Sequence, residues 1–247
     1  MADPFDAVAE SYDVMVDWPT RLAREKPFFE KLLHEQPVYR ALDVGCGTGH
    51  HSRLFAEMGA TVIGIDPSEQ MVQHARSLTT TPNPSFMVGD FDDIATLPGD
   101  FDLVVALGNT LAFVEGNRQL VQMLNDTHDK LSAGGRICIQ VINYDRVLRE
   151  GVHRLPLVHR QRDNREYLFL REYRTIDDKV EFTISMLIRD GEWRQGIERA
   201  EHYPLTQRAL EEGLQRAGFT NFNFYGDFQR TPYDPVTSPG LVVLAKL

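Results

Sequence analysis

"ALDVGCGTGHHSRLF", residues 41–55, places Gly45, Gly47 and Gly49 at every second position, between an apolar run and a helix-like segment. The run of residues 38–44 that leads into the glycines is largely apolar, which predicts a strand buried on both faces. Glycine permits unusual backbone angles and leaves no Cβ between the backbone and a ligand. Ligands of open parallel sheets bind beyond the carboxyl ends of the strands, where the next helix presents free N–H groups. The stretch therefore predicts a ligand-binding turn after the first strand.

Short apolar runs alternate with helix-like stretches before and after this turn. Strands are expected at residues 38–44, 61–66, 85–90, 101–107 and 135–142, and helices at 68–78 and 118–131. Strands that alternate with helices predict a parallel sheet with right-handed crossovers.

The pattern changes after about Arg146. Every second residue from Val180 to Ile188 is apolar, and the following Asp190-Gly191 favours a hairpin turn, which together predict antiparallel strands. The alternation of strand and helix then returns with a helix at 206–219. The fold class expected is α/β, a Rossmann-like, mostly parallel sheet flanked by helices, with an antiparallel β insertion capping the active site. Its core is expected at 1–145 and 205–247, and the insertion at 146–204.

Composition limits the classes of partner. The 247 residues carry a formal net charge of −10, which disfavours nucleic acid because proteins that bind a phosphate backbone normally show a basic face. No apolar run approaches the roughly 18 residues of a membrane helix, and the acidic N-terminus predicts no signal peptide. Cys46 and Cys138 lie in apolar segments and are expected to be buried free thiols. A cytoplasmic protein with a small-molecule partner, and without nucleic acid or membrane, is predicted.

Two cofactor classes use a glycine-rich turn followed by an acid. Asp66 ends the second predicted strand, where a carboxylate can accept hydrogen bonds from both hydroxyls of a ribose. Dinucleotide folds require G-x-G-x-x-G, and His50 stands where the third glycine would be. A nicotinamide oxidoreductase is therefore disfavoured. The adjacent His50 and His51 do not predict a metal site, since consecutive helical residues point about 100° apart.

"DVGCGTG" (43–49) resembles the first motif of class I S-adenosylmethionine-dependent methyltransferases, in which this loop borders the methionine part of the cofactor. In the same resemblance Asp66 matches the ribose-binding acid. "GDFDD" (89–93) matches the segment that contacts adenine, with Asp90 for the exocyclic amine and Phe91 for stacking. Three motifs in order on three predicted strands predict this cofactor, with S-adenosylhomocysteine as its product.

Further landmarks are similar to those of glycine N-methyltransferases, namely "ALGNTLAF" (106–113), "NYDRVL" (143–148), "HYPL" (202–205) and "GDF" (226–228). Residues 12–33 look like that family's opening helix, which helps to enclose the cofactor. The resemblance implies that Arg21 addresses the methionine carboxylate and that Asn109 lies where cofactor and acceptor meet. The candidate cofactor residues are Tyr12, Trp18, Arg21, Asp43, Gly45, Cys46, Gly47, Gly49, Asp66, Pro67, Met71, Asp90, Phe91, Asp92, Leu107 and Asn109.

The candidates for positioning a methyl acceptor are Asn109, Asn143, Tyr144 and Tyr203, and no general base is assigned. Three positions depart from the family pattern. Ile142 stands where the family has the arginine for the glycine carboxylate, Phe113 stands for a histidine, and Ile184 aligns with a tyrosine. A bidentate arginine cannot be replaced by an aliphatic side chain. An acceptor other than glycine, in a more apolar site, is therefore expected.

The function expected from the resemblance is methyl transfer to a small molecule, with an amine nitrogen as the leading acceptor. The alternatives are O-methylation of a small metabolite, N-methylation of an amino sugar, and a module that binds the cofactor without catalysis. The resemblance also leaves a homo-oligomer possible.

Overall fold

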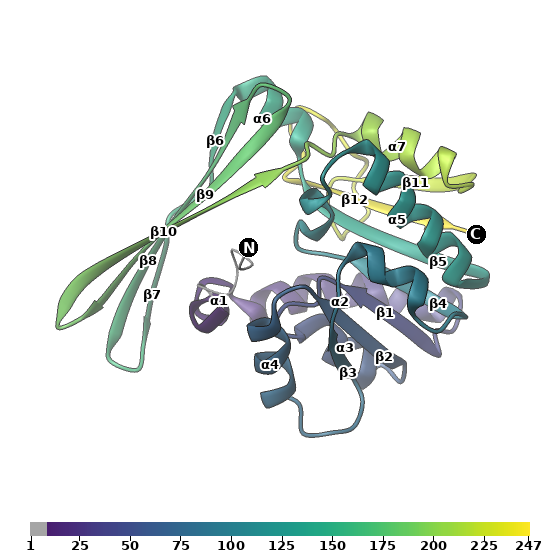
Figure 1. Ribbon diagram of the computed structural model, residues 1–247, viewed down its shortest axis with the longest axis horizontal. Coiled ribbons are helices and arrows are strands. Elements are labelled where there is room, and N and C mark those ends of the chain that lie inside the picture. Colours follow the sequence, from purple (N-terminus) through teal and green to yellow (C-terminus); the bar gives the residue numbers. More distant parts are fainter. Residues whose placement is uncertain (1–8) are drawn as a thin grey trace.

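The central sheet of the computed structural model, which describes residues 9–247, has seven strands in the order β11-β12-β5-β4-β1-β2-β3 (Figure 1). The parallel strands are β1 (Arg40–Val44), β2 (Thr61–Asp66), β3 (Ser85–Val88), β4 (Phe101–Ala106) and β5 (Leu131–Ile142). β12 (Gly240–Lys246) runs antiparallel to β5, and β11 (Asn221–Tyr225) runs antiparallel to β12. The expected mostly parallel sheet is confirmed, and its last two strands form the antiparallel edge.

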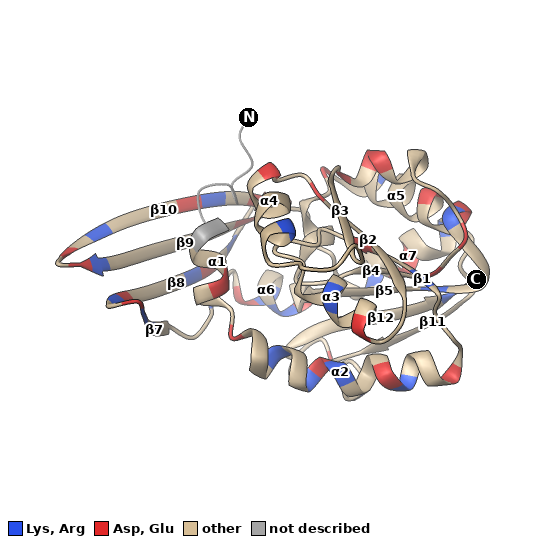
Figure 2. Ribbon diagram, turned by 90° about the horizontal axis from the view of Figure 1, so that it is seen from below, with Lys and Arg blue, Asp and Glu red and all other residues tan. Residues whose placement is uncertain are grey.

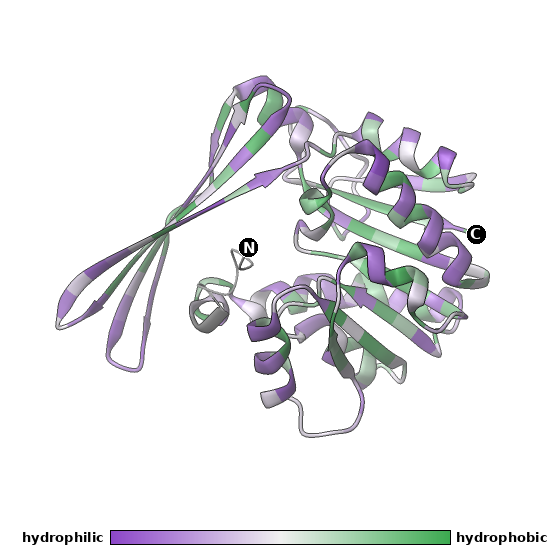
Figure 3. Cartoon of the chain, viewed as in Figure 1, coloured by the Kyte–Doolittle hydropathy of each residue, from purple (hydrophilic) through white to green (hydrophobic). Residues whose placement is uncertain are grey.

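Helices cover both faces of this sheet because its strands are apolar on both faces (Figure 3). On one face Phe29 of α2 (Trp18–Glu35) and Phe55 of α3 (His50–Glu57) pack on Leu103. On the other face Leu124 of α5 (Asn117–Lys130) and Leu210 of α7 (Gln207–Arg216) belong to the core cluster built on alternate residues of the same strands. α4 (Glu69–Ser77) lies against β2 and β3.

A second, five-stranded antiparallel sheet follows α6 (Tyr144–Glu150) and stands apart from the core in Figure 1. Its strands are β6 (Val152–Arg154), β7 (Val158–Arg162), β8 (Arg165–Ile176), β9 (Lys179–Asp190) and β10 (Glu192–His202). Gly191 has a φ of 80° in the β9–β10 hairpin, as the Asp-Gly pair predicted. The sheet itself spans 152–202, because residues 144–150 form a helix.

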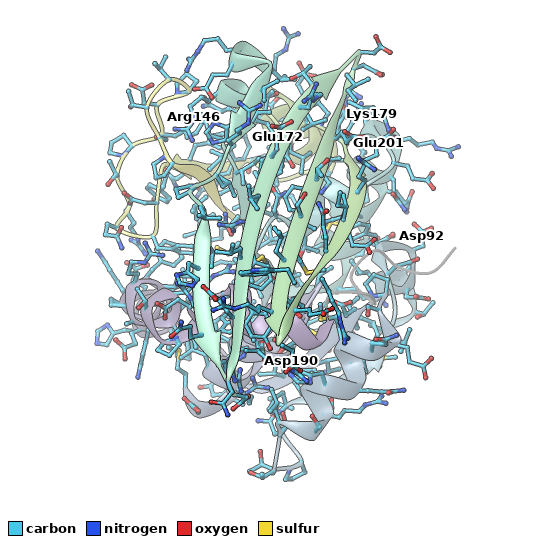
Figure 4. All side chains as sticks on the ribbon, turned by 90° about the vertical axis from the view of Figure 1, so that its left-hand side faces the viewer. Asp92, Arg146, Glu172, Lys179, Asp190 and Glu201 are labelled. Carbon is cyan, nitrogen blue, oxygen red and sulfur yellow. The ribbon has the colours of Figure 1, made fainter. Side chains whose placement is uncertain are left out.

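The outer face of this sheet is charged. Figure 4 shows Lys179 and Glu201 close together near one end of the strands, where they form an ion pair of 2.8 Å, and Asp190 at the hairpin end. Charges of both signs are also interspersed along α2 in Figure 2. Within the described chain, no helix combines the length and the apolar character needed to cross a membrane.

The predicted single opening helix over 12–33 is wrong, because the chain forms α1 (Ala9–Met15) and then α2. Asp17 caps α2 by accepting a hydrogen bond from the Thr20 N–H at 3.2 Å. Pro19 follows in the first turn, where its missing N–H costs no helical hydrogen bond, and this favours the start of a new helix at this point. The break lets α1 turn toward the antiparallel sheet, where Val14 and Met15 pack against β8 and β9.

Candidate functional site

A pocket, which we call the first chamber, lies at the carboxyl ends of β1, β2 and β4 and has a volume of ≈ 130 Å³. Sequence-predicted residues form most of its lining, namely Tyr12, Trp18, Arg21, Gly45, Cys46, Gly47, Asp66, Pro67, Met71, Asp90, Phe91 and Leu107. The sequence analysis missed Val44, His51, Gly89, Gly108, Thr110 and Phe113, which line it as well.

The three glycines of the turn have different neighbours, although all have positive φ. A Cβ on Gly45 would lie 2.1 Å from Cγ2 of Thr110, and a Cβ on Gly49 would lie 2.6 Å from the ring of Phe86. A Cβ on Gly47 would meet only Tyr12, at 4.0 Å. A side chain is thus excluded at Gly45 and Gly49 by packing against Thr110 and Phe86, and only Gly47 leaves open space beside its backbone.

Asp66 supports the turn as well as lining the chamber. Its Oδ2 accepts the Gly47 N–H at 2.8 Å, and its Oδ1 accepts the Ser68 N–H at 3.0 Å. The residue is only 8% exposed. The carboxylate is thus fixed by backbone donors at the edge of the first chamber.

Asp90 and Phe91 start the 3₁₀ helix η1 (Phe91–Thr96) and line the first chamber. Asp90 caps this helix by accepting the Asp92 N–H at 2.9 Å, while its own N–H donates to Asp93. Asp92, also predicted from the sequence, is exposed and accepts a hydrogen bond from Gln119 at 3.3 Å, outside the chamber.

Glu25 of α2 is a buried carboxylate that connects α2 to α3. Glu25 accepts from Arg21 Nε at 2.9 Å and lies 2.6 Å from Nε2 of His51. Burial disfavours its charged form, but the hydrogen bond with His51 and the charge of Arg21 outweigh burial and lower the pKa of Glu25. The Arg21 guanidinium also lies over the ring of Trp18, 5.0 Å from its centroid. Arg21 is held in place with its terminal nitrogens close to Gly108.

Three other predicted cofactor residues do not line the first chamber. Asp43 is buried and accepts from the Ser52 hydroxyl at 2.6 Å, and burial raises the pKa of its carboxyl. Gly49 is the N-cap residue of α3. Asn109 lines a second pocket instead.

This second chamber has a volume of ≈ 380 Å³ and lies between the core and the antiparallel sheet. Tyr12, Arg21, Gly108 and Phe113 line both chambers, so the two are neighbours. The antiparallel sheet contributes Arg171, Tyr173, Phe182, Ile184 and His202 to the second chamber. Ile142 also lines it, together with charged side chains such as those of Arg171 and Asp227.

Asn109 starts a chain of buried hydrogen bonds that ends in the second chamber. Its Oδ1 accepts the Ile142 N–H at 3.1 Å, so its Nδ2 must be the atom that donates to the Tyr144 hydroxyl at 2.9 Å. That hydroxyl lies 2.9 Å from Nδ1 of His202. Burial raises the pKa of Tyr144 and lowers the pKa of His202 to about 3, so the phenol keeps its proton and the imidazole is neutral.

Two tautomers of His202 are compatible with this chain. The Tyr144 hydroxyl has two acceptor sites, so it can accept from Asn109 and share a hydrogen bond with Nδ1 of His202 in either direction. Nε2 is buried and has no hydrogen-bond partner among the described residues. His202, which the sequence analysis quoted only as part of the HYPL landmark, lines the second chamber as a neutral imidazole.

Two predicted acceptor residues have other surroundings. Asn143 caps α6, and its Nδ2 donates to the carbonyl of Ser238 at 3.0 Å while its Oδ1 accepts from the hydroxyl of Tyr233 at 2.7 Å. Tyr203 packs on the main core, and its N–H donates to the carbonyl of Ala112. Neither residue lines either chamber, and Tyr144 is completely buried behind Asn109.

We expect His202→Gln to remove a pH dependence of the free energy of unfolding. The folded-state pKa of His202 lies below its unfolded value of 6.5, so below pH 6.5 the unfolded chain binds one more proton. Stability from this group is complete above pH 6.5 and falls by about 1.4 kcal/mol per pH unit on acidification toward pH 3. Urea unfolding between pH 5 and 7 measures this slope.

The exposed His34 on α2 supplies the matched control, because His34→Gln should leave the slope as in the parent protein. Equal slopes in the parent protein and the His202→Gln variant would show that His202 is protonated in the folded state.

Among the residues that the structure describes, no group of three or more His, Cys, Asp or Glu side chains could hold a metal ion. Cys46 and Cys138 are free and buried, as predicted. Burial raises the pKa of both thiols, so they are protonated at neutral pH.

Comparison with known proteins adds to this geometry. Residues 41–135 match the family model described as a methyltransferase domain. A glycine/sarcosine N-methyltransferase from Aphanothece halophytica is 26% identical over 234 residues, which cover 92% of this chain and 83% of that protein. DesVI from Streptomyces venezuelae has the same fold, with a TM-score of 0.78 at 20% identity over 98% of both chains. The SAM-bound amino pentose methyltransferase CalS10 from Micromonospora echinaspora gives a TM-score of 0.72 at 18% identity, over 100% of this chain and 98% of that one.

The domain match and the relatives define the class of the protein. The chain is a class I S-adenosylmethionine-dependent methyltransferase, and S-adenosylmethionine is its cofactor. Along most of its length its sequence is similar to the glycine/sarcosine N-methyltransferases. The predictions of fold class, of methyltransferase activity and of the cofactor are confirmed.

Proposed function

We propose that this enzyme methylates an amine nitrogen of a small molecule bound in the second chamber. The observation that carries the proposal is that this chamber adjoins the first at Tyr12, Gly108 and Phe113 and that its described histidine, His202, is buried and neutral. Its relative from Aphanothece halophytica is named a glycine/sarcosine N-methyltransferase, which agrees with an amine acceptor.

The first chamber suits the cofactor residue by residue. Asp66 would accept the ribose hydroxyls, and Asp90 with Phe91 would hold adenine. Arg21 would bind the methionine carboxylate through its terminal nitrogens, since its Nε is engaged by Glu25. Gly47 leaves room where a side chain would project beside Tyr12. When bound, the cofactor supplies an electrophilic methyl group on its sulfonium.

The second chamber positions the methyl acceptor and does not remove a proton from it. Glu25 is paired with Arg21 and His51, and Asp227 accepts the N–H groups of Gln229 and Thr231. Burial lowers the pKa of His202 to about 3, so this imidazole is too weak a base to take up a proton from the acceptor at neutral pH. An amine that binds neutral needs no base, whereas a hydroxyl does. Alignment and exclusion of water can then contribute up to about 7–11 kcal/mol in favourable cases.

A panel of amines, each paired with the alcohol of the same skeleton, tests the proposal. We expect S-adenosylhomocysteine to be released with amine members only, at a rate that rises with pH as the free amine becomes the major form. Turnover of alcohols without turnover of their amine partners would contradict an amine acceptor. Cofactor binding without turnover of any member would favour a module that binds without catalysis.

An amino sugar is a second acceptor candidate. The ≈ 380 Å³ chamber falls in the size range of small-molecule sites. The fold likeness to CalS10 extends over 100% of this chain, the antiparallel sheet included. Amino sugars therefore belong in the panel. The cytoplasmic location and a homo-oligomer stay predictions, and free cysteines at 46 and 138 support the first of these.

A further inference from the structure

Arg171, a partly buried cation that lines the second chamber, forms no ion pair with any described carboxylate. Arg171 lies on β8 between Phe169 and Tyr173, at every second position, so it shares their inward face of the strand. Its neighbour across the strand pair is Ile184 of β9. A guanidinium is thereby placed on a face that is otherwise aromatic and aliphatic, and it lines the second chamber.

Two other arginines of the same strand form ion pairs with carboxylates of the sheet. Arg165 binds Asp190 at 3.0 Å, and Arg174 binds Glu172 at 2.8 Å. The Nε of Arg171, by contrast, is buried without a hydrogen-bond partner, and no carboxylate among the described residues forms an ion pair with its guanidinium. A cation in such a place costs free energy unless another group compensates it.

The surroundings of Arg171 supply no such anion. Burial lowers the pKa of Arg171, while the phenols of Tyr173 and Tyr12 act in the opposite direction. A guanidinium remains charged even so. The phenols themselves are protonated, because burial raises the pKa of both tyrosines. The carboxylates that line the chamber, those of Glu25 and Asp227, have partners of their own.

We infer that Arg171 binds an anionic group, a carboxylate or a phosphate, of the molecule that this enzyme methylates. The inference rests on the proposed function, and it narrows the acceptor to an amine that carries such a group. The planar guanidinium matches both kinds of oxyanion with paired hydrogen bonds. The apolar wall of Phe182, Ile142 and Ile184 holds the carbon skeleton between this anchor and the reacting nitrogen.

Binding by the enzyme saturated with S-adenosylhomocysteine tests this inference apart from turnover. The carboxylate probe is sarcosine, compared with sarcosine amide, and the phosphate probe is glucosamine 6-phosphate, compared with glucosamine. We expect at least one anionic probe to bind about 10-fold or more tightly than its neutral counterpart. The probe that does so identifies the kind of anion.

Two variants assign the preference to Arg171. Arg171→Met keeps the length of the stem and should abolish the preference, and Arg171→Lys should keep a part of it. Arg174→Met, on the opposite face of the same strand, is the matched control and should keep the whole of it. All three variants should bind S-adenosylhomocysteine as the parent protein does, which verifies that they fold.

The inference fails if neither anionic probe is preferred, or if the preference persists in Arg171→Met. Methyl transfer to the same probes is read separately. A preference that depends on Arg171, without methylation of any amine, would contradict the proposed function and leave the anion site standing. Methylation of the anionic amines at an equal rate by the parent protein and by Arg171→Met would do the reverse, supporting the proposed function and contradicting the anion site.

Discussion

Gly45→Ala should lower the free energy of unfolding by about 2–5 kcal/mol and greatly weaken the binding of S-adenosylhomocysteine. Gly45 has a φ of 67°, a left-handed conformation that costs an L-residue about 1–2 kcal/mol. Its new Cβ would lie 2.1 Å from Cγ2 and 2.4 Å from Oγ1 of Thr110, and such overpacking costs about 1–3 kcal/mol more. Relief of the clash must move either the turn or η2 (Thr110–Phe113), and both border the first chamber.

A second glycine separates the two causes. Gly59, after α3, has a φ of 98°, and a Cβ there would meet nothing within 4 Å. Gly59→Ala therefore reports the backbone cost alone, with unchanged ligand binding. Thermal unfolding and calorimetric titration measure both variants, and an equal, small loss in the two would show that the turn accepts a side chain at Gly45.

Asp66→Ala should weaken the binding of S-adenosylhomocysteine by about 1–3 kcal/mol, roughly 10- to 100-fold, because a charged acceptor of the ribose is lost. The same change deprives the N–H groups of Gly47 and Ser68 of their acceptor, so the turn loses support as well. Calorimetric titration measures the affinity, and thermal unfolding of the free protein measures the structural part.

A ligand analogue isolates the ribose contact. The parent protein should bind 2′-deoxy-S-adenosylhomocysteine more weakly than the complete ligand, whereas Asp66→Ala should distinguish the two little. Asp92→Ala is the matched control, since Asp92 lies two residues beyond the adenine candidate Asp90 but faces Gln119 outside the chamber. Loss of affinity in Asp92→Ala equal to that in Asp66→Ala would contradict the lining described above.

The sequence predicted those parts of the molecule that depend on local periodicity. The continuously apolar strand before Gly45 indicates burial on both faces, and the alternation along β8 and β9 indicates burial on one face. Both sheets could therefore be predicted. The turn and Asp66 were predictable because their spacing along β1 and β2 is set by strand geometry. The interruption between α1 and α2 depends on the capping carboxylate of Asp17 and on Pro19. The helical periodicity of the surrounding residues does not indicate it.

The remaining site residues depend on distant packing. His51 meets Glu25 only because α2 and α3 pack together, with Phe29 and Phe55 in edge contact at 4.9 Å between ring centroids. His202 lies 93 residues after Asn109 in the sequence, and the two side chains meet only in the folded protein. His202 is neutral because the fold buries it. No spacing rule relates such residues, because their positions follow from packing of the whole chain.

Calorimetric titration of the purified protein with S-adenosylhomocysteine and, separately, with NAD tests the central claim most directly. A turn built for an adenosyl sulfonium should bind S-adenosylhomocysteine at one site per chain and give no heat with NAD. Binding of NAD, or indifference to S-adenosylhomocysteine at millimolar concentration, would contradict the assignment of the first chamber.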